Sequence, residues 1–291
     1  MALDGGQVTA DSVLDVRQPL EAGRYTIRDP HPAGRPLTVA EIFVRSSNVG
    51  AGMLALEAGA DRQRAFFDRL GLTASIKTEA GPVAAPLLPA QWNKVETITL
   101  AYGHGIALAP VQFAAAAAAL VNGGRRVTPT LLRRLPGDTV AGGAAGDAVV
   151  TPETSRVMRE LMRRNVTDPA GTGRKAAAAG YRVGGKTGTA EMAVKGGYKA
   201  SAVISSFLAA FPMEAPRYVA LVMIFEPRPT KAAQGQVAAG NNAAPTAGLL
   251  IARIAPLLGV MPEGAAEPLV DAASVVDPGP AAFDGVDDAK Y

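Results

Sequence analysis

The chain has 291 residues, 48% of them hydrophobic and 19% charged, which is enough for one large domain or two small ones with a core. Cysteine is absent and histidine occurs twice, so a disulfide framework and a thiolate metal site are excluded, and neither a metal ion nor a cofactor is expected. The net charge is +3, but no basic stripe interleaved with aromatic residues indicates a nucleic-acid partner.

Neither end of the chain predicts a membrane segment. No apolar run approaches the ~18 residues that a spanning helix needs. Met1–Val16 does not combine a basic start with an apolar segment, so we expect no signal peptide in this chain. The first residues have the pattern of a helix end with its glycine cap.

Helices are predicted from capping residues and from apolar residues at helical spacing. Thr38 and Glu41 have the spacing of a capping box. The predicted helices are Thr38–Arg45, Val49–Ala58, Asp61–Leu70, one from Pro110 to Asn122, one opened by Thr151-Pro152, and Pro245–Leu258. In the last of these, the residues expected to face inward are Leu249, Leu250, Ile254, Leu257 and Leu258. Thr73–Trp92 is irregular, and Val95–Tyr102 alternates only loosely.

Strands are predicted in the second half of the chain. Ser201–Phe211 and Arg217–Phe225 are apolar runs separated by a proline-bounded turn, which predicts a hairpin. Tyr181–Met192 is expected to pair beside them as an edge strand. From Val260 onward the sequence is rich in proline, alanine and aspartate and is expected to be disordered, which predicts a domain over residues 1–260 and an acidic tail over 261–291.

The strand from Tyr181 carries the first candidate site. Lys186, Thr187 and Thr189 are expected to face a cleft, and Gly188 to leave room for a ligand against the main chain. A cation, hydroxyls and N–H groups on one edge suit a carboxylate-bearing ligand.

Two other interpretations of this stretch remain open. In the first, it is an ordinary strand with a surface lysine. In the second, Gly180–Thr187 is a phosphate-binding loop, since these residues match the motif G-x-x-x-x-G-K-[ST]. A phosphate loop needs a helix that opens at Lys186, and the glycines Gly188, Gly196 and Gly197 are poor helix sequence.

Ser46-Ser47-Asn48, between two predicted helices, is the second candidate site. Taken alone, it is explained by helix capping. The order of the elements is a more specific signal than this motif alone: Ser46-Ser47-Asn48 is followed by Lys186-Thr187-Gly188, a hairpin and a terminal helix. Together with Arg45–Gly50, Ala101–Ile106 and Gly180–Val183, it resembles the class B penicillin-binding protein transpeptidases, especially the cell-division type, whose motifs are S-x-x-K, S-x-N and K-T-G.

The resemblance covers Met1 to Leu258 and implies an α/β fold, with an antiparallel sheet flanked by helices as in penicillin-binding transpeptidases and serine β-lactamases. One motif is missing, because no serine of the chain is followed by lysine three positions later. In this family S-x-x-K opens a helix just ahead of the segment matching Met1. We therefore expect a fragment that begins after the nucleophile helix, lacks the nucleophile and is inactive alone.

The resemblance also implies a role for each matched residue. Ser46 would lie in the proton path near the leaving amine, Asn48 would bind the amide carbonyl of the donor peptide, and Lys186 would supply positive potential. Thr187 and Thr189 would hold the terminal carboxylate, and the N–H of Thr189 would form half of the oxyanion hole.

The implied partners are peptidoglycan stem peptides, β-lactams once the missing serine is restored, and possible glycosyltransferase and divisome proteins, at the periplasmic face of the inner membrane. The membrane anchor would lie outside this chain. A non-catalytic cell-wall binding or scaffold module is the alternative from another class, and a phosphate-loop NTPase is the third.

Overall fold

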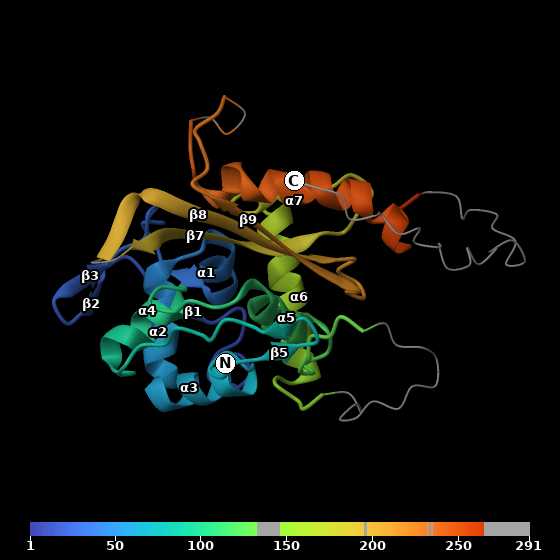
Figure 1. Ribbon diagram of the computed structural model, residues 1–291. Coiled ribbons are helices and arrows are strands. Elements are labelled where there is room, and N and C mark those ends of the chain that lie inside the picture. The colour runs from blue at the N-terminus through green and yellow to red at the C-terminus, as the bar shows by residue number, and fades with distance from the viewer. Residues whose placement is uncertain (133–145, 195–196, 232, 234, 265–291) are drawn as a thin grey trace, which may run out of the picture.

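An antiparallel sheet of three strands, in the order β7-β8-β9, runs through the middle of the molecule (Figure 1). The computed structural model describes residues 1–132, 146–194, 197–231, 233 and 235–264. The strands are β7 (Gly184–Val194), β8 (Gly197–Phe211) and β9 (Tyr218–Phe225). The predicted strand and hairpin are thereby confirmed, and among the described residues no strand pairs with the outer edge of β7.

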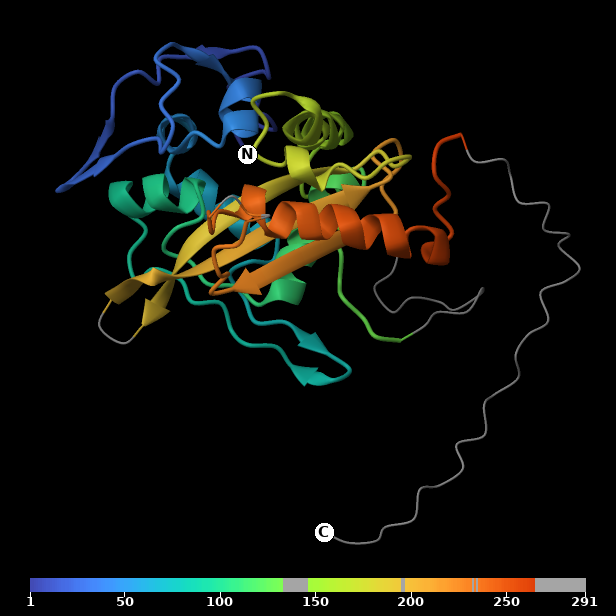
Figure 2. The same cartoon turned by 90° about the horizontal axis from the view of Figure 1, so that it is seen from above.

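Helices cover both faces of this sheet, as predicted. α7 (Ala243–Ile254) lies on one face, where its Ile251 packs with Phe207 and Phe211 of β8 (Figure 2). α1 (Val39–Arg45), α5 (Pro110–Val121) and α6 (Pro152–Thr167) lie on the other face (Figure 1). Leu208 of β8 packs there against Val121 and Met162. Successive residues of a strand point to opposite faces, so β8 contributes to two cores at once.

The remaining helices form a second layer below the sheet in Figure 1. They are α2 (Asn48–Ala58), α3 (Ala60–Arg69) and α4 (Lys94–Ala101). α4 is the loosely alternating stretch, and its first turn is capped by Asn93, whose side chain accepts from the N–H of Val95 at 2.8 Å. The short elements are β1 (Val13–Leu14), β2 (Leu20–Ala22), β3 (Tyr25–Ile27), β4 (Leu37–Thr38), β5 (Lys77–Thr78), β6 (Gly81–Pro82) and the 3-10 turns η1 (Arg174–Ala176), η2 (Ala239–Asn241) and η3 (Pro256–Leu258).

The predicted capping box is present at the start of α1. Thr38 Oγ1 accepts from the N–H of Glu41 at 3.1 Å, and the Glu41 carboxylate accepts from the N–H of Thr38 at 3.0 Å. Arg35 also binds that carboxylate and holds the pKa of Glu41 down at about 2. The pairing fixes where α1 begins, and therefore where its other end places Ser46.

The inward face predicted for the last helix is right for two residues and wrong for three. Ile254 and Leu258 pack against the core on the α7 side, whereas Leu249, Leu250 and Leu257 are 66%, 38% and 85% exposed. The buried residues of α7 are Ala243, Ala244, Ala247, Gly248 and Ile251. A Cβ on Gly248 would lie 3.0 Å from the carbonyl oxygen of Ala176, so the helix approaches η1 too closely for a large side chain. Close packing of this small face turns Leu249 and Leu250 outward.

The chain beyond α7 is described only as far as Gly264. Val260 is 6% exposed, and the N–H of Glu263 donates to the carbonyl of Gly180 at 2.7 Å. Ordered structure therefore extends into the stretch predicted to be disordered, and the rest of that tail, residues 265–291, lies outside the described residues. Within the described ranges, none of the helices has the length and apolar character needed to cross a membrane.

Candidate active site

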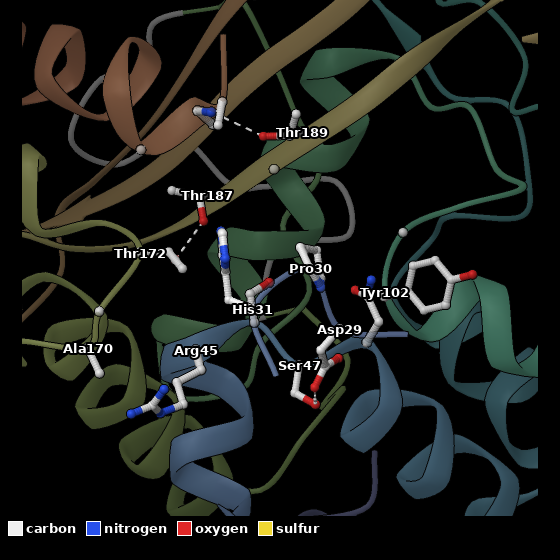
Figure 3. A pocket seen from close by; sticks show the side chains of 18 of the residues that line it. Asp29, Pro30, His31, Arg45, Ser47, Tyr102, Ala170, Thr172, Thr187 and Thr189 are labelled. Carbon is white, nitrogen blue, oxygen red and sulfur yellow. Dashed lines mark hydrogen bonds between the residues drawn. The ribbon is translucent and has the colours of Figure 1, made fainter. Parts of the chain in front are cut away.

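A cleft of about 790 Å³ opens along the free edge of β7 (Figure 3). It lies where the sheet edge meets the junction of α1 and α2 and the loop that follows α6. Its walls come from five parts of the chain: residues 29–48, 102–104, 169–175, 187–191 and 236–241. Segments far apart in the sequence thus meet at one edge, and both candidate motifs lie there.

Ser46 and Lys186 are in direct contact. Lys186 Nζ donates to Ser46 Oγ at 2.8 Å and to the carbonyl of Thr187 at 3.2 Å, and it lies 5.9 Å from the centre of the Phe43 ring. Burial lowers the pKa of Lys186 to about 8, because removal from water disfavours the charged ammonium. A lysine with this pKa can exchange a proton with a bound hydroxyl near neutral pH.

Ser46 has an unusual backbone. It ends α1 in the left-handed region, at φ 60°, which residues other than glycine seldom adopt. Its N–H bonds to the carbonyls of Ile42 and Phe43 in the last turn of the helix. This turn directs the chain back into α2, and strain of this kind is concentrated at functional sites.

The three residues of the Ser-Ser-Asn motif make different contacts. Ser47 is the N-cap of α2: its Oγ accepts from the N–H of Gly50 at 3.0 Å and donates to Asp29 Oδ2 at 2.7 Å (Figure 3). The capping interpretation is therefore correct for Ser47. Asn48 is the first residue of α2, lines the cleft, and donates from Nδ2 to the carbonyl of Arg28 at 3.4 Å.

Thr187 and Thr189 lie on the other face of β7 from Lys186. The register pairs Lys186 with Leu208, on the α5 side, and Thr187 with Phe207, on the α7 side. The expectation that all three side chains line one cleft is therefore wrong for Lys186, since side chains alternate along a strand. Lys186 reaches the cleft through Ser46, while Thr187 and Thr189 line it directly.

Both threonine hydroxyls are already engaged within the protein. Thr187 Oγ1 lies 2.7 Å from Thr172 Oγ1, and Thr189 Oγ1 accepts from the N–H of Ala239 at 3.1 Å (Figure 3). Gly188 lies between them, and a Cβ there would come within 2.6 Å of Ser206 Oγ. The glycine is thus needed for packing against β8 as well as for access to the main chain.

Several cleft residues were not found from the sequence. Asp29 binds Ser47 and also accepts from the N–H of Val49 at 3.0 Å, yet it lies in a loop that only an Asp-Pro pair marks as a turn. Thr172 stands between Gly171 and Gly173, and a Cβ on either glycine would collide with Asn165. That Gly-Thr-Gly run is the sequence signal for a tightly packed loop here.

Charged side chains line the mouth of the cleft. Arg45, Arg174 and Lys175 are exposed on the side of α1 and η1, and Lys175 Nζ donates to Asn241 Oδ1 at 2.6 Å. Asp29 and Glu191 also line the cleft. A cationic rim of this kind suits an anionic ligand. Among the described residues, no group of three or more histidine, aspartate or glutamate side chains could hold a metal ion.

The phosphate-loop interpretation does not fit this geometry. Lys186 and Thr187 lie inside β7, which continues to Val194. A phosphate loop places its lysine at the N-terminus of a helix, where N–H groups point at the phosphates. No such helix begins here.

Comparison with known proteins agrees with the geometry. Residues 1–246 match the family model "Penicillin binding protein transpeptidase domain". A probable peptidoglycan D,D-transpeptidase FtsI of Caulobacter vibrioides is 39% identical over 268 residues, covering 89% of this chain and 45% of that protein. Penicillin-binding protein PbpB of Mycolicibacterium smegmatis is 33% identical over 258 residues, covering 84% of this chain and 39% of that protein. The chain thus spans less than half the length of these two relatives.

A solved structure gives the same result. The transpeptidase domain of Burkholderia pseudomallei penicillin-binding protein 3 superposes with a TM-score of 0.80 at 28% identity, covering 90% of this chain and 77% of that one.

Proposed function

The chain belongs to the family of penicillin-binding protein transpeptidase domains, and on that premise we propose that it forms the substrate-binding part of a peptidoglycan D,D-transpeptidase of the cell-division type. The contact between Lys186 Nζ and Ser46 Oγ, beside the free edge of β7, is the observation that carries the proposal. It joins a cation of lowered pKa to a hydroxyl beside an open sheet edge, along which an extended peptide can lie against the main chain.

Each cleft residue has a role in this proposal. A stem peptide lies along β7 as an added strand, with its terminal carboxylate at the hydroxyls of Thr187 and Thr189. Asn48 binds the amide carbonyl of the donor peptide, and Gly188 leaves the main chain accessible. The N–H of Thr189 is one of two donors to the oxyanion, the type of electrostatic support that contributes most to acyl transfer.

Lys186 and Ser46 handle the proton. When the acyl–amide bond of the terminal D-Ala breaks, the departing amine needs a proton, and Ser46 Oγ passes one on from Lys186. A lysine pKa of about 8 makes this transfer cheaper than from an exposed lysine, whose pKa is near 10.5. The attacking nucleophile is a serine in S-x-x-K, and no serine of the 291 residues stands in that motif.

A labelled penicillin and a denaturing gel test the proposal. The chain of 291 residues should form no covalent adduct, and a chimera that adds the segment preceding the matched region of the Caulobacter relative should be labelled. A band on the chain itself, mapped to Ser46 or Ser47, would overturn the assignment. A chimera that melts cooperatively yet takes no label would overturn the transpeptidase proposal.

A second candidate function rests on the cleft and its cationic rim, which by themselves suit binding of an anionic peptide. A non-catalytic cell-wall binding module would keep the cleft and use it to hold stem peptides without acyl transfer. It would bind a D-Ala-D-Ala peptide and remain unlabelled even in the chimera, and this separates the two.

The wider setting follows from the same premise. The partners are peptidoglycan stem peptides and, with the S-x-x-K serine in place, β-lactams. We propose that the protein acts at the periplasmic face of the inner membrane, together with a glycosyltransferase and other division proteins. Co-purification with division proteins after cross-linking in cells would test this setting.

A further inference from the structure

A chain of hydrogen bonds runs from the interior to the cleft through Asn165, Thr172 and Thr187. Asn165 on α6 is fully buried, and its Nδ2 donates to the carbonyl of Val44 at 2.8 Å and to Thr172 Oγ1 at 3.0 Å. Thr172 Oγ1 in turn lies 2.7 Å from Thr187 Oγ1 (Figure 3). The two threonines line the cleft, so the chain ends where a ligand would bind.

The direction of this chain is fixed at its buried end. The carbonyl oxygen of Val44 can only accept, so the Asn165 atom beside it must be the NH2 group and not the amide oxygen. Both hydrogens of that group are then used, one on Val44 and one on Thr172. Asn165 Oδ1 is buried without a partner among the described residues. Burying an unpaired oxygen is costly, and the cost is explained if the side chain is kept for its two donors.

The hydroxyl of Thr172 receives the bond from Asn165 and therefore donates onward. A hydroxyl has a single hydrogen, and in the described part of the chain Thr187 Oγ1 is the acceptor within reach. If Thr187 donated instead, Thr172 Oγ1 would accept twice, and the bonds would oppose rather than polarise one another. The run Asn165 to Thr172 to Thr187 leaves the hydrogen of Thr187 directed away from Thr172 and available to a ligand.

We infer that Thr172, held by Asn165, is a positioning residue that presents the Thr187 hydroxyl to the cleft as a hydrogen-bond donor and so selects peptides ending in a carboxylate over the same peptides ending in an amide. The inference rests on the proposed function. A carboxylate only accepts hydrogen bonds, whereas a terminal amide brings its own donors and does not need a fixed donor at Thr187. Thr172 acts through Thr187 and has no step of its own.

The same contacts join two parts of the site. Val44, which accepts from Asn165, lies two residues before Ser46 in the last turn of α1, and the N–H of Thr172 also donates to Val44 at 3.3 Å. Asn165 therefore ties the end of α1 to the loop that carries Thr172. The carboxylate-binding hydroxyl and the Ser46 turn share one buried anchor.

The test is a titration of the 291-residue chain with N-acetyl-D-alanyl-D-alanine and with its C-terminal amide, followed by NMR or calorimetry. The wild type should bind the carboxylate form about tenfold or more tightly, as expected for one charge-assisted hydrogen bond. Thr172→Val should lose about tenfold of that preference and bind the amide form as the wild type does. Thr172→Ser keeps the hydroxyl and should keep the preference.

A double variant shows whether Thr172 acts through Thr187. Thr187→Val alone should reduce the preference at least as much as Thr172→Val does, and Thr172→Val/Thr187→Val should be no worse than Thr187→Val. Melting temperatures measured beside each titration, with unchanged affinity for the amide form, report that the fold is intact.

The outcomes separate the two ideas. If Thr172→Val keeps the wild-type preference, the positioning inference is wrong and the proposed function stands. If the wild type binds neither peptide, or both equally, the carboxylate role of Thr187 is wrong and the inference falls with it.

Discussion

The two faces of the β7–β9 sheet are built from alternate residues of the same strands and each carries a core, yet only one of them borders the proton-handling part of the site. Toward α7, Phe207 and Phe211 pack with Ile251 and small alanines in an apolar layer, which ends at the cleft where Thr187 and Thr189 lie. Toward α1, α5 and α6, Leu208 packs with Met162, but its register partner on β7 is Lys186. Phe207 and Leu208, adjacent in β8, therefore have different surroundings: Phe207 lies in the α7 core, and Leu208 lies next to Lys186.

The difference between the faces arises from what covers them at the edge. On the α7 face, small residues allow the helix to approach closely and exclude water. On the other face, α1 ends at Ser46, and the hydroxyl of Ser46 accepts a hydrogen bond from the Lys186 ammonium. A polar contact therefore takes the place of apolar packing at this edge. Strand alternation assigns residues to faces, and the covering helices decide where a face is closed as a core and where it borders the site.

The largest effect is expected from breaking the apolar face. Phe207 is fully buried, and Phe207→Ala should lower the free energy of unfolding by about 3–5 kcal/mol, through lost burial and the cavity left behind. Urea denaturation followed by circular dichroism measures it. A loss below about 1 kcal/mol would mean that this face is not the core described here.

Lys186 provides the matching test on the polar face. Its folded pKa of about 8 lies below the ordinary 10.5, so between these pH values the unfolded chain holds a proton that the folded chain has released. Stability should therefore rise with pH through this window, by up to about 3 kcal/mol at ~1.4 kcal/mol per pKa unit.

The free energy of unfolding of Lys186→Met should not show this rise with pH. Other titrating groups are present in both proteins, so their contributions cancel in the difference between the two. Urea denaturation of the two proteins from pH 7 to pH 10 measures the difference. Parallel stability curves would show that the lysine is not desolvated.

The two adjacent serines sharpen the comparison within the site. Ser47→Ala removes the N-cap of α2 and leaves Asp29 without its hydroxyl partner, and it should cost about 1–2 kcal/mol. Ser46→Ala removes a contact with Lys186 and should cost less than Ser47→Ala. Melting curves of the two variants decide the order, and the reverse order would contradict the division of roles between Ser46 and Ser47.

The smallest effect is expected on the outer side of α7. Leu249 is 66% exposed, so Leu249→Gln should change the free energy of unfolding by less than about 0.5 kcal/mol. Ile251→Ala, two residues away and fully buried, is the matched control and should cost about 2–5 kcal/mol. Equal losses of stability at the two positions would indicate that Leu249 is buried, as the sequence predicted.

Much of the fold follows from local patterns. The Thr38–Glu41 spacing correctly predicts the start of α1, Pro110 and Thr151-Pro152 the starts of α5 and α6, and the proline-bounded turn the β8–β9 hairpin. These signals succeed because capping, proline geometry and turns act within a few residues. Leu249 and Leu250 were wrongly predicted to face inward because both sides of α7 are apolar, and only its neighbours show which side packs.

The sequence by itself determined the motifs, the family and the strand that carries Lys186, Thr187, Gly188 and Thr189. Tertiary structure decided which of these residues meet. Ser46 and Lys186 are 140 residues apart, and Asn165 reaches Val44 across 121 residues. No local spacing encodes such contacts, since they depend on how α1, α6 and the sheet pack together. The same packing places Lys186 and Thr187 on opposite faces of β7, where alternation sends one toward Ser46 and the other toward Thr172.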